Sequence, residues 1–329
     1  MASAREIKRR MKSVKNIMQV TRALEAVSAS KVRRATAQAV RSRIYADLAL
    51  ELLNNVAAAS QSGQSLHPLL TPRDSDGPIT ILLITGDRGL AGAYNTNVIR
   101  VARHFVRRMG RPARWVAVGR KGRDILIRAK ENLVAEFTGL PPYLRFQDLS
   151  PIARVLMDEF LTRSADEVYI AYTDFINTLT QKPRVERLLP LSAGANPLPD
   201  ADYMKVIAPP TTRVTDYLYE PSPEGILEEI VPRFTQLVIF QAILEATASE
   251  HSARMVAMRN ASDNANTLVD AYLLAYNKAR QLSITSEILD IVGGVEALRK
   301  TRAETPTPDE TPSSELEEPH HQVGAGRQA

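Results

Sequence analysis

The chain has 329 residues, a formal net charge of +5 and no cysteine, so disulfides, cysteine nucleophiles and thiolate metal sites are excluded. Its apolar fraction of 44% and charged fraction of 24% are typical of a globular protein, whereas the aromatic fraction of only 5% favours long helices. The five histidines are scattered, and none has the His-x-x-x-His spacing of a helical zinc site.

The N-terminal segment predicts one continuous helix, because residues 2–58 contain neither glycine nor proline. Small or apolar residues recur along it at alternating intervals of three and four, as in a coiled-coil seam. The seam consists of Ile7, Met11, Val14, Met18, Thr21, Leu24, Ser28, Val32, Ala35 and Ala39. Such a helix is roughly 85 Å long, too long for one compact core, so it needs a partner helix.

The same segment is strongly basic. Residues 1–60 hold 12 lysines and arginines against 4 acidic residues, which indicates an acidic partner: nucleic acid, anionic lipid or an acidic protein loop. The N-terminus lacks the apolar core of a signal peptide, and no run of 18 apolar residues occurs in the chain. We therefore expect a protein that stays in a cytoplasm-like compartment.

The middle of the chain predicts a mostly parallel α/β sheet. After a linker rich in Gly, Pro and Ser, short apolar runs alternate with helix-like stretches. The predicted strands are residues 79–85, 114–119, 132–137 and 167–173, and a helix is predicted over 150–163. Residues 184–219 are expected to add further strand-like pieces and loops.

The last part predicts a second long helix, from the N-cap Ser222 to about residue 299, with a kink at Pro232. Its seam consists of Ile226, Ile230, Phe234, Leu237, Gln241, Leu244, Thr247, His251, Met255, Met258, Ser262, Ala265, Leu268, Tyr272 and Ala275. Because both long helices need a partner, we expect them to pair antiparallel, with the α/β domain inserted between them. Two separate helical domains are the alternative.

These patterns divide the chain into five parts. They are an N-terminal coiled-coil helix (1–60), a linker (61–78), an α/β domain (79–220), a C-terminal coiled-coil helix (221–300) and a tail (301–329). The tail holds six acidic residues and four prolines, so it is predicted to be disordered.

One segment resembles a phosphate-binding loop. Residues 85–95, TGDRGLAGAYN, follow a strand and open a helix, and Arg88 could meet a phosphate or a carboxylate there. However, the glycines are spaced G-x-x-G-x-x-G, and no Lys-Ser/Thr pair follows. A tight turn that packs strand against helix is therefore favoured over a nucleotide site. Because no Ser-His-Asp set, carboxylate pair or metal cluster can be assembled, a non-catalytic protein is expected.

Four stretches together resemble the gamma subunit family of F-type ATP synthases. They are REIKRRMKSVKNIMQVTRALEAVSASKVRRA, LLITGDRGLAGAYNTNVIR, DYLYEPSPEGILEEIVPRF and ASEHSARMVAMRNASDNANTLVDAYLLAYNKARQLSITSEILDIVGGVEAL, and residues 2–298 follow the family's order. The resemblance implies a long antiparallel coiled coil with an inserted Rossmann-like α/β domain. It also implies a central rotor shaft that turns with a membrane c-ring inside a ring of three alpha and three beta subunits. Nucleotides would bind on those subunits, so no cofactor is expected on this chain.

The resemblance also assigns roles to single residues. Contacts with the beta subunit are expected from Leu24, Arg88, Ala91, Arg280, Gln281 and Thr285. A basic arm facing an acidic lever loop of beta is expected from Lys8, Arg9, Arg10, Lys12 and Lys15. Tyr217 and Glu220 are expected at the foot against the c-ring, and Ile288, Ile291 and Val292 in an apolar bearing.

The implied partners are the alpha and beta subunits, the epsilon subunit and the c-ring, with one copy of this chain per complex and no nucleic acid. The chain would lie on the cytoplasmic side of a bacterial plasma membrane, held there only through the complex. The tail at 301–329 is outside the family core, and it either tunes hydrolysis or does nothing. Two other classes stay open: a nucleotide-binding α/β enzyme with helical arms, and a basic coiled-coil protein that binds nucleic acid.

Overall fold

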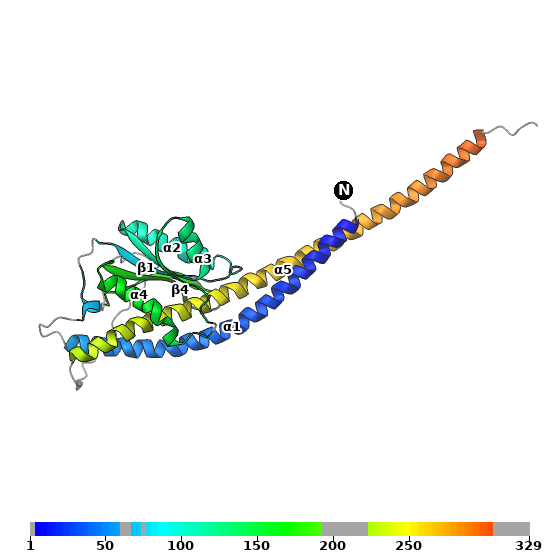
Figure 1. The fold of residues 1–329 in the computed structure, drawn as a ribbon. Coiled ribbons are helices and arrows are strands. Elements are labelled where there is room, and N and C mark those ends of the chain that lie inside the picture. The colour runs from blue at the N-terminus through cyan, green and yellow to red at the C-terminus, as the bar shows by residue number, and fades with distance from the viewer. Residues whose placement is uncertain (1–3, 60–66, 74–76, 142, 192–222, 305–329) are drawn as a thin grey trace, which may run out of the picture. The chain divides into compact units, whose positions relative to one another are not determined.

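The computed structural model describes residues 4–59, 67–73, 77–141, 143–191 and 223–304 (Figure 1). The chain forms two units. The central unit is Lys12–Val269, and the terminal unit combines Met1–Met11 with Asp270–Ala329.

The central unit contains a five-stranded sheet with the order β3-β2-β1-β4-β5. The strands are β1 (Ile79–Ile84), β2 (Ala113–Val118), β3 (Asn132–Phe137), β4 (Glu167–Phe175) and β5 (Gln181–Leu189). The first four are parallel, and β5 runs antiparallel to β4. The four predicted strands are confirmed. The fifth begins three residues earlier than the strand-like pieces expected from residue 184, because a short turn joins it directly to β4.

Helices cover both faces of this sheet (Figure 1). α2 (Tyr94–Met109) and α3 (Arg120–Arg128) pack on one face, and α4 (Ser150–Leu161) with the first part of α5 (Pro223–Glu304) packs on the other. Successive side chains of a strand point to opposite faces. Thus Ile81 and Leu83 belong to the core under α2, and Leu82 and Ile84 to the core under α4 and α5. Two short 3-10 helices, η1 (Pro68–Leu70) and η2 (Phe146–Leu149), complete this layer.

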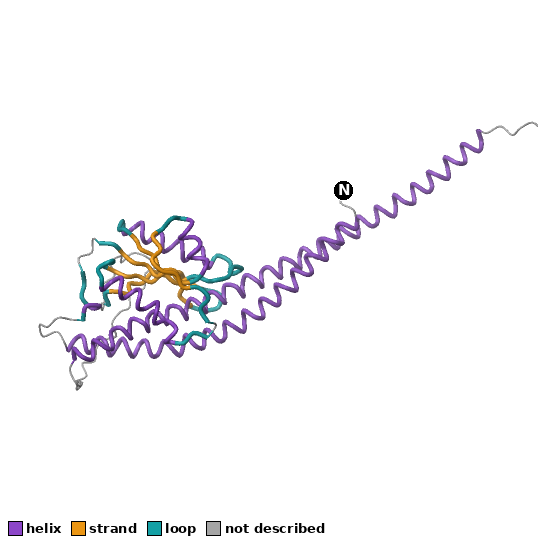
Figure 2. The backbone as a smooth tube through the Cα atoms, viewed as in Figure 1, coloured by secondary structure: helices purple, strands orange, loops and turns teal. Residues whose placement is uncertain are grey.

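The two long helices pair antiparallel within the central unit (Figure 2). The Thr21 and Ser262 hydroxyls of α1 (Ala4–Ala59) and α5 lie 2.7 Å apart, and Gln241 Nε2 donates to the Ala39 carbonyl at 3.4 Å. The predicted seam residues Thr21, Ser28, Val32, Ala35 and Ala39 are buried. The α/β domain is thus inserted between two paired helices, and the alternative of two separate helical domains is wrong.

The predicted course of α5 needs two corrections. Its seam passes through Val269, which is 8% exposed, and not through Leu268, which is 50% exposed. The step after Ala265 is therefore four residues and not three, which the alternating pattern alone does not decide. Pro232 lies inside the helix, and Thr235 Oγ1 donates to the Val231 carbonyl beside it. The helix ends at Glu304, a few residues beyond the predicted end.

Candidate functional site

The loop after β1, residues 85–93, lies at the carboxyl edge of the parallel strands. Loops that follow parallel strands meet at this edge. Asp87 joins three of them, because its Oδ1 accepts from the Arg120 amide and its Oδ2 from the Gly139 amide, both at 3.0 Å. Arg120 Nε also lies 3.7 Å from Asp87 Oδ1. Asp87 therefore fixes the loops after β2 and β3 to the loop after β1.

Thr85 adds two further hydrogen bonds between the loop after β1 and the loop after β2. Its Oγ1 donates to the Val118 carbonyl at 3.0 Å and accepts from the Gly122 amide at 2.8 Å. Gly119 has φ of +92°, and a Cβ there would lie 2.1 Å from the Thr85 carbonyl oxygen. Glycine is therefore required at position 119 both for the backbone conformation and for the close approach.

The N-terminus of α3 has no free amide for a phosphate. The Arg120 amide donates to Asp87, the Lys121 amide to the Gly86 carbonyl at 3.1 Å, and the Gly122 amide to Thr85. A phosphate-binding helix start needs such N–H groups pointing at the ligand. The start of α3, which follows β2, therefore offers no phosphate site, and the Gly86 amide of the loop after β1 donates to Asn95 Oδ1 at 2.9 Å.

The loop after β1 is also hydrogen-bonded to α5. Arg254 Nε donates to the Gly89 carbonyl at 3.3 Å, and Arg254 pairs with Glu250 one helical turn away. Tyr94, which begins α2, donates its hydroxyl to the Ala246 carbonyl at 3.0 Å. The roles of Arg254 and Asp87 are not predicted from the sequence. The only sequence signal for Arg254 is its i,i+4 spacing from Glu250, which many solvated helices share.

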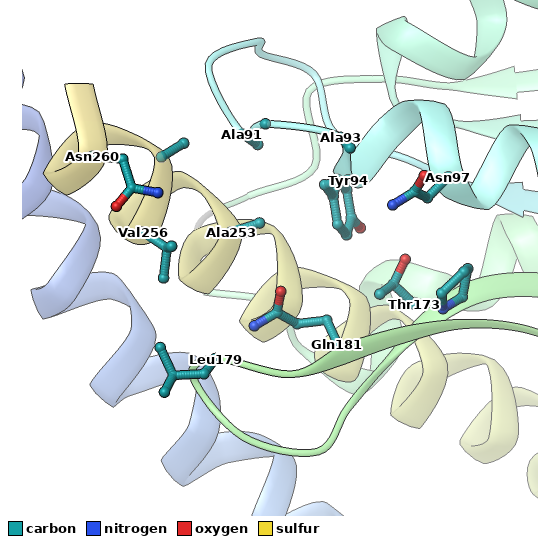
Figure 3. A pocket seen from close by; sticks show the side chains of 13 residues that line it. Ala91, Ala93, Tyr94, Asn97, Thr173, Leu179, Gln181, Ala253, Val256 and Asn260 are labelled. Carbon is teal, nitrogen blue, oxygen red and sulfur yellow. The ribbon is translucent and has the colours of Figure 1, made fainter. Parts of the chain in front are cut away.

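The loop presents some of the residues expected to contact a partner and hides others. Arg88 is exposed, and Leu90 beside it is 64% exposed. Ala91 is only 2% exposed, and Figure 3 shows it beside a pocket that it lines together with Tyr94. Arg88 can therefore reach a partner through its side chain. Ala91 itself is not accessible, so the neighbouring Leu90 is the accessible group at this point of the loop.

The remaining predicted residues of the central unit lie on α1. Lys12 and Lys15 are exposed, and Leu24 is half-buried. Tyr217 and Glu220, the expected foot contacts, lie outside the described residues.

The terminal unit carries the other part of the basic arm. Lys8, Arg9 and Arg10 are exposed. Arg10 Nη2 lies 2.6 Å from Glu6 Oε1, and the hydrogen bond to this carboxylate raises the pKa of Arg10. Exposed pairs of this kind contribute little to stability, so the arm stays available as a set of positive charges.

The end of α5 lies bare in the terminal unit. Every residue from 281 to 300 is exposed, including Ile288, Ile291 and Val292 at 55%, 67% and 59%. Arg280 and Gln281 are exposed too, and Thr285 Oγ1 donates to the Gln281 carbonyl at 2.9 Å. Polar and apolar side chains of this segment are thus all accessible to a partner.

Neither a metal site nor a membrane span is found in the part of the chain that the structure describes. No three His, Asp or Glu side chains there are placed to hold a metal ion. No described helix is both long and apolar enough to cross a bilayer.

Comparison with known proteins gives close relatives along nearly the whole chain. The model of a family described as ATP synthase matches residues 3–298. The ATP synthase gamma chain of Herpetosiphon aurantiacus is 43% identical over 308 residues, which cover 91% of this chain and all of that relative. The ATP synthase gamma chain of Dehalococcoides mccartyi is 44% identical over 298 residues, again 91% of this chain and all of the relative.

Solved structures share the fold at lower sequence identity. A chain in the cryo-EM structure of the Euglena gracilis mitochondrial ATP synthase, with OSCP, F1 and the c-ring, has a TM-score of 0.63 and 21% identity. The match covers 94% of this chain and 98% of that one. A chain of the central stalk and c-ring of the Tetrahymena thermophila mitochondrial ATP synthase has a TM-score of 0.54, 23% identity and coverage of 74% and 99%.

Proposed function

Because this chain belongs to the family of ATP synthase gamma chains, we propose that it is the central rotor shaft of an F-type ATP synthase. In this role it turns with a membrane c-ring and forces the catalytic sites of three surrounding beta subunits through successive conformations. The observation that carries the proposal is the 43% identity that extends over the whole length of a gamma chain.

The paired helices of the central unit suit a shaft that transmits torque. Small side chains such as Thr21, Ser28, Ala35 and Ser262 fill the seam, so the two helix axes can approach closely. The α/β domain is fixed to this pair, because Arg254 holds the loop after β1 and Gln38 donates to the Leu144 carbonyl at 2.8 Å. A force applied to the domain therefore reaches both helices.

The bare end of α5 suits rotation inside a sleeve formed by other subunits. Its apolar residues Ile288, Ile291 and Val292 would slide in an apolar bearing. Arg280, Gln281 and Thr285 would meet a loop of the beta subunit at particular rotor angles. Hydrogen bonds to charged groups contribute about 1.5–3 kcal/mol each, enough to define such angles while remaining breakable.

The basic arm would act by attraction at longer range. Lys8, Arg9, Arg10, Lys12 and Lys15 would face an acidic lever loop of the beta subunit. Single exposed ion pairs are worth about 0–1 kcal/mol. These residues would therefore guide the chain past the beta subunit by weak attraction and would not fix it in one orientation.

Further contacts are proposed with the beta subunit and with the c-ring. Leu24 on α1 and Arg88 with Ala91 in the loop after β1 would contact the beta subunit as well. Tyr217 and Glu220 would meet the c-ring.

The chain itself would be non-catalytic and hold no nucleotide. The amides at the start of α3 are bonded within the protein, which supports the absence of a phosphate site at that helix. The proposed complex contains one copy of the chain with the alpha, beta and epsilon subunits and the c-ring. It would lie on the cytoplasmic side of a bacterial plasma membrane, to which the chain is attached only through its partners.

Co-expression with the alpha and beta subunits of the same organism tests the proposal. We expect a complex with one copy of this chain per three alpha–beta pairs, and multi-site ATPase activity that depends on the chain. A stable solitary protein and unchanged ATPase activity without it would contradict the proposed function.

A further inference from the structure

A concentration of positive charge lies on α2 and α3 of the central unit, which cover the same face of the sheet (Figure 1). Residues 94–131 hold 11 lysines and arginines against 2 acidic residues, a net charge of +9, whereas the whole chain carries only +5. The basic patch consists of the exposed residues Arg100, Arg107, Arg108, Arg128 and Lys130.

These five residues share one surface, because the end of α3 lies against α2. Arg103 Nη2 of α2 is 3.3 Å from Oε1 of Glu131, the residue that follows Lys130. Arg100 and Arg107 are three residues before and four residues after Arg103, so they lie on its side of the helix.

The positive charges of the patch are not neutralised by neighbouring carboxylates. Within the described ranges of the chain, none of the five residues forms an ion pair. Arg100 and Arg128 donate only to neutral acceptors, the Asn97 side chain and the Asp124 carbonyl, both at 3.0 Å. Three of the five lie in the last turn of a helix, where cations complement the helix dipole, but Arg100 and Lys130 do not. The patch is therefore available to an anionic partner.

An exposed apolar side chain beside the patch indicates which anion it fits. Ile127 directly precedes Arg128 and is 54% exposed. Cations around an exposed apolar side chain are typical of surfaces that lie on an anionic membrane. Single-stranded nucleic acid would need exposed aromatic rings, and Tyr94, Phe105 and Trp115 of this segment are all buried.

Four of the five patch residues lie at the edge of the sheet opposite to the loop after β1. Helices that connect parallel strands return to the amino edge, and the Ile79 amide at the start of β1 donates to the carbonyl of Pro112, just after α2, at 2.9 Å. The proposed function places the beta subunits at the Arg88 loop, so the amino edge points towards the c-ring and the membrane. In this respect the inference rests on the proposed function.

We propose that the basic patch docks on anionic lipid headgroups of the membrane surface beside the c-ring. The five cations meet the headgroup phosphates, and Ile127 enters the boundary between headgroups and acyl chains. Because lipids are mobile within the bilayer, this contact does not fix the chain in one orientation. The partners remain the attachment of the chain, and the patch adds a weaker attraction to the surface below it.

Flotation of the purified full chain with lipid vesicles tests the proposal. Vesicles of equal parts phosphatidylglycerol and phosphatidylcholine carry a negative surface, whereas vesicles of phosphatidylcholine alone carry phosphates without net charge. We expect binding to the anionic vesicles only, and release of the chain at high salt.

Two triple variants locate the charges responsible. Each basic residue near an anionic surface raises the binding constant about fivefold, so Arg107→Gln, Arg108→Gln and Lys130→Gln together should weaken binding about 100-fold. The matched control removes three exposed charges from α1 by Lys12→Gln, Lys15→Gln and Arg22→Gln. It should stay within about threefold of the wild type, because charges farther than a Debye length from the surface are screened. Urea midpoints check that both variants are folded.

A fluorescent reporter locates the contact independently of charge. The native Trp115 is only 1% exposed, so a change of emission on vesicle binding comes from an introduced indole. We expect a blue shift with Ile127→Trp on anionic vesicles. No shift is expected with Ile17→Trp, which replaces an isoleucine of α1 that is also 54% exposed.

Four results would overturn the inference. They are the absence of binding to anionic vesicles, equal losses of affinity in the two triple variants, and a blue shift with Ile17→Trp but not with Ile127→Trp. The fourth is vesicle binding that is lost on assembly with the alpha, beta and epsilon subunits, which would identify the patch as a docking surface for an acidic partner. Because the first three are measured on the chain alone, they leave the rotor assignment standing, which the co-expression experiment tests separately.

Discussion

Two glycines with positive φ, Gly119 after β2 and Gly110 at the end of α2, differ sharply in what they tolerate. Gly119 and Gly110 both have positive φ, but a Cβ at Gly119 would collide with the Thr85 carbonyl, whereas one at Gly110 meets nothing within 4 Å. Gly119→Ala is therefore expected to lower the free energy of unfolding by about 3 kcal/mol or more, and Gly110→Ala by about 1 kcal/mol. Urea denaturation of both variants measures the difference. Equal losses would mean that the clash is relieved by a small shift of the β1 loop.

The exposed polar residues on α5, in contrast, are expected to matter for the activity of the complex and not for the stability of the chain. Among the described residues, the only hydrogen bond lost when Arg280, Gln281 and Thr285 are all replaced by alanine is that of the Thr285 hydroxyl to its own helix, so the stability of the isolated chain should change by less than about 0.5 kcal/mol. The ATPase activity of the assembled complex should fall about tenfold or more, because charge-assisted contacts are lost.

A matched control is Glu287→Ala with Asp290→Ala, which changes two polar residues on the same bare segment. This control should leave the activity within about twofold of the wild type. If both sets of changes reduced activity equally, the proposed beta contact would not be specific to Arg280, Gln281 and Thr285.

The α1–α5 pair contains a pH-sensitive element. Burial, with the positive charges of Arg254 and Lys31, lowers the pKa of His251 to about 4. In the unfolded chain the pKa of a histidine is about 6.5, so between pH 6.5 and pH 4 it is mainly the unfolded state that takes up the proton. The contribution of neutral His251 to stability is thus complete above about pH 6.5 and decreases as the pH falls towards 4.

Comparison of the wild type with His251→Gln at pH 7.5 and pH 5.5 isolates this effect. On acidification the wild type should lose about 1 kcal/mol more than the variant in urea denaturation. Glu250, which pairs with Arg254, is present in both proteins and contributes equally. The same pH dependence in both would show that His251 is solvated in the folded protein.

Elements were easier to predict than the contacts between them. The absence of Gly and Pro in residues 2–58 and the β-branched run of β1 indicate a helix and a strand by local chemistry alone. The change of seam from Leu268 to Val269 could not be read in the same way, because both side chains are apolar and only the packing of α1 decides between them. The Arg254–Gly89 bond joins residues that are distant in the sequence, so no local pattern predicts it.

At the scale of the whole molecule, the two units differ in how much they bury. Both hydrophobic cores consist of residues between Ala39 and Ala246, inside the central unit. A shortened chain of residues 12–269 should therefore fold cooperatively, with a free energy of unfolding within about 1 kcal/mol of that of the full chain. Thermal and urea unfolding of the two proteins compare them directly. Gradual, non-cooperative unfolding of the shortened chain would show that the terminal unit is needed for folding.

The bare end of α5 has a consequence for the free chain before it meets any partner. A helix that is exposed on all sides opens locally at little cost in free energy. Backbone amides of residues 281–300 should therefore exchange with deuterium much sooner than those around the buried Ser249 and Ser252 of the same helix. A surrounding sleeve would slow this exchange, so deuterium uptake at one end of one helix would report how much of the protein is free and how much is assembled.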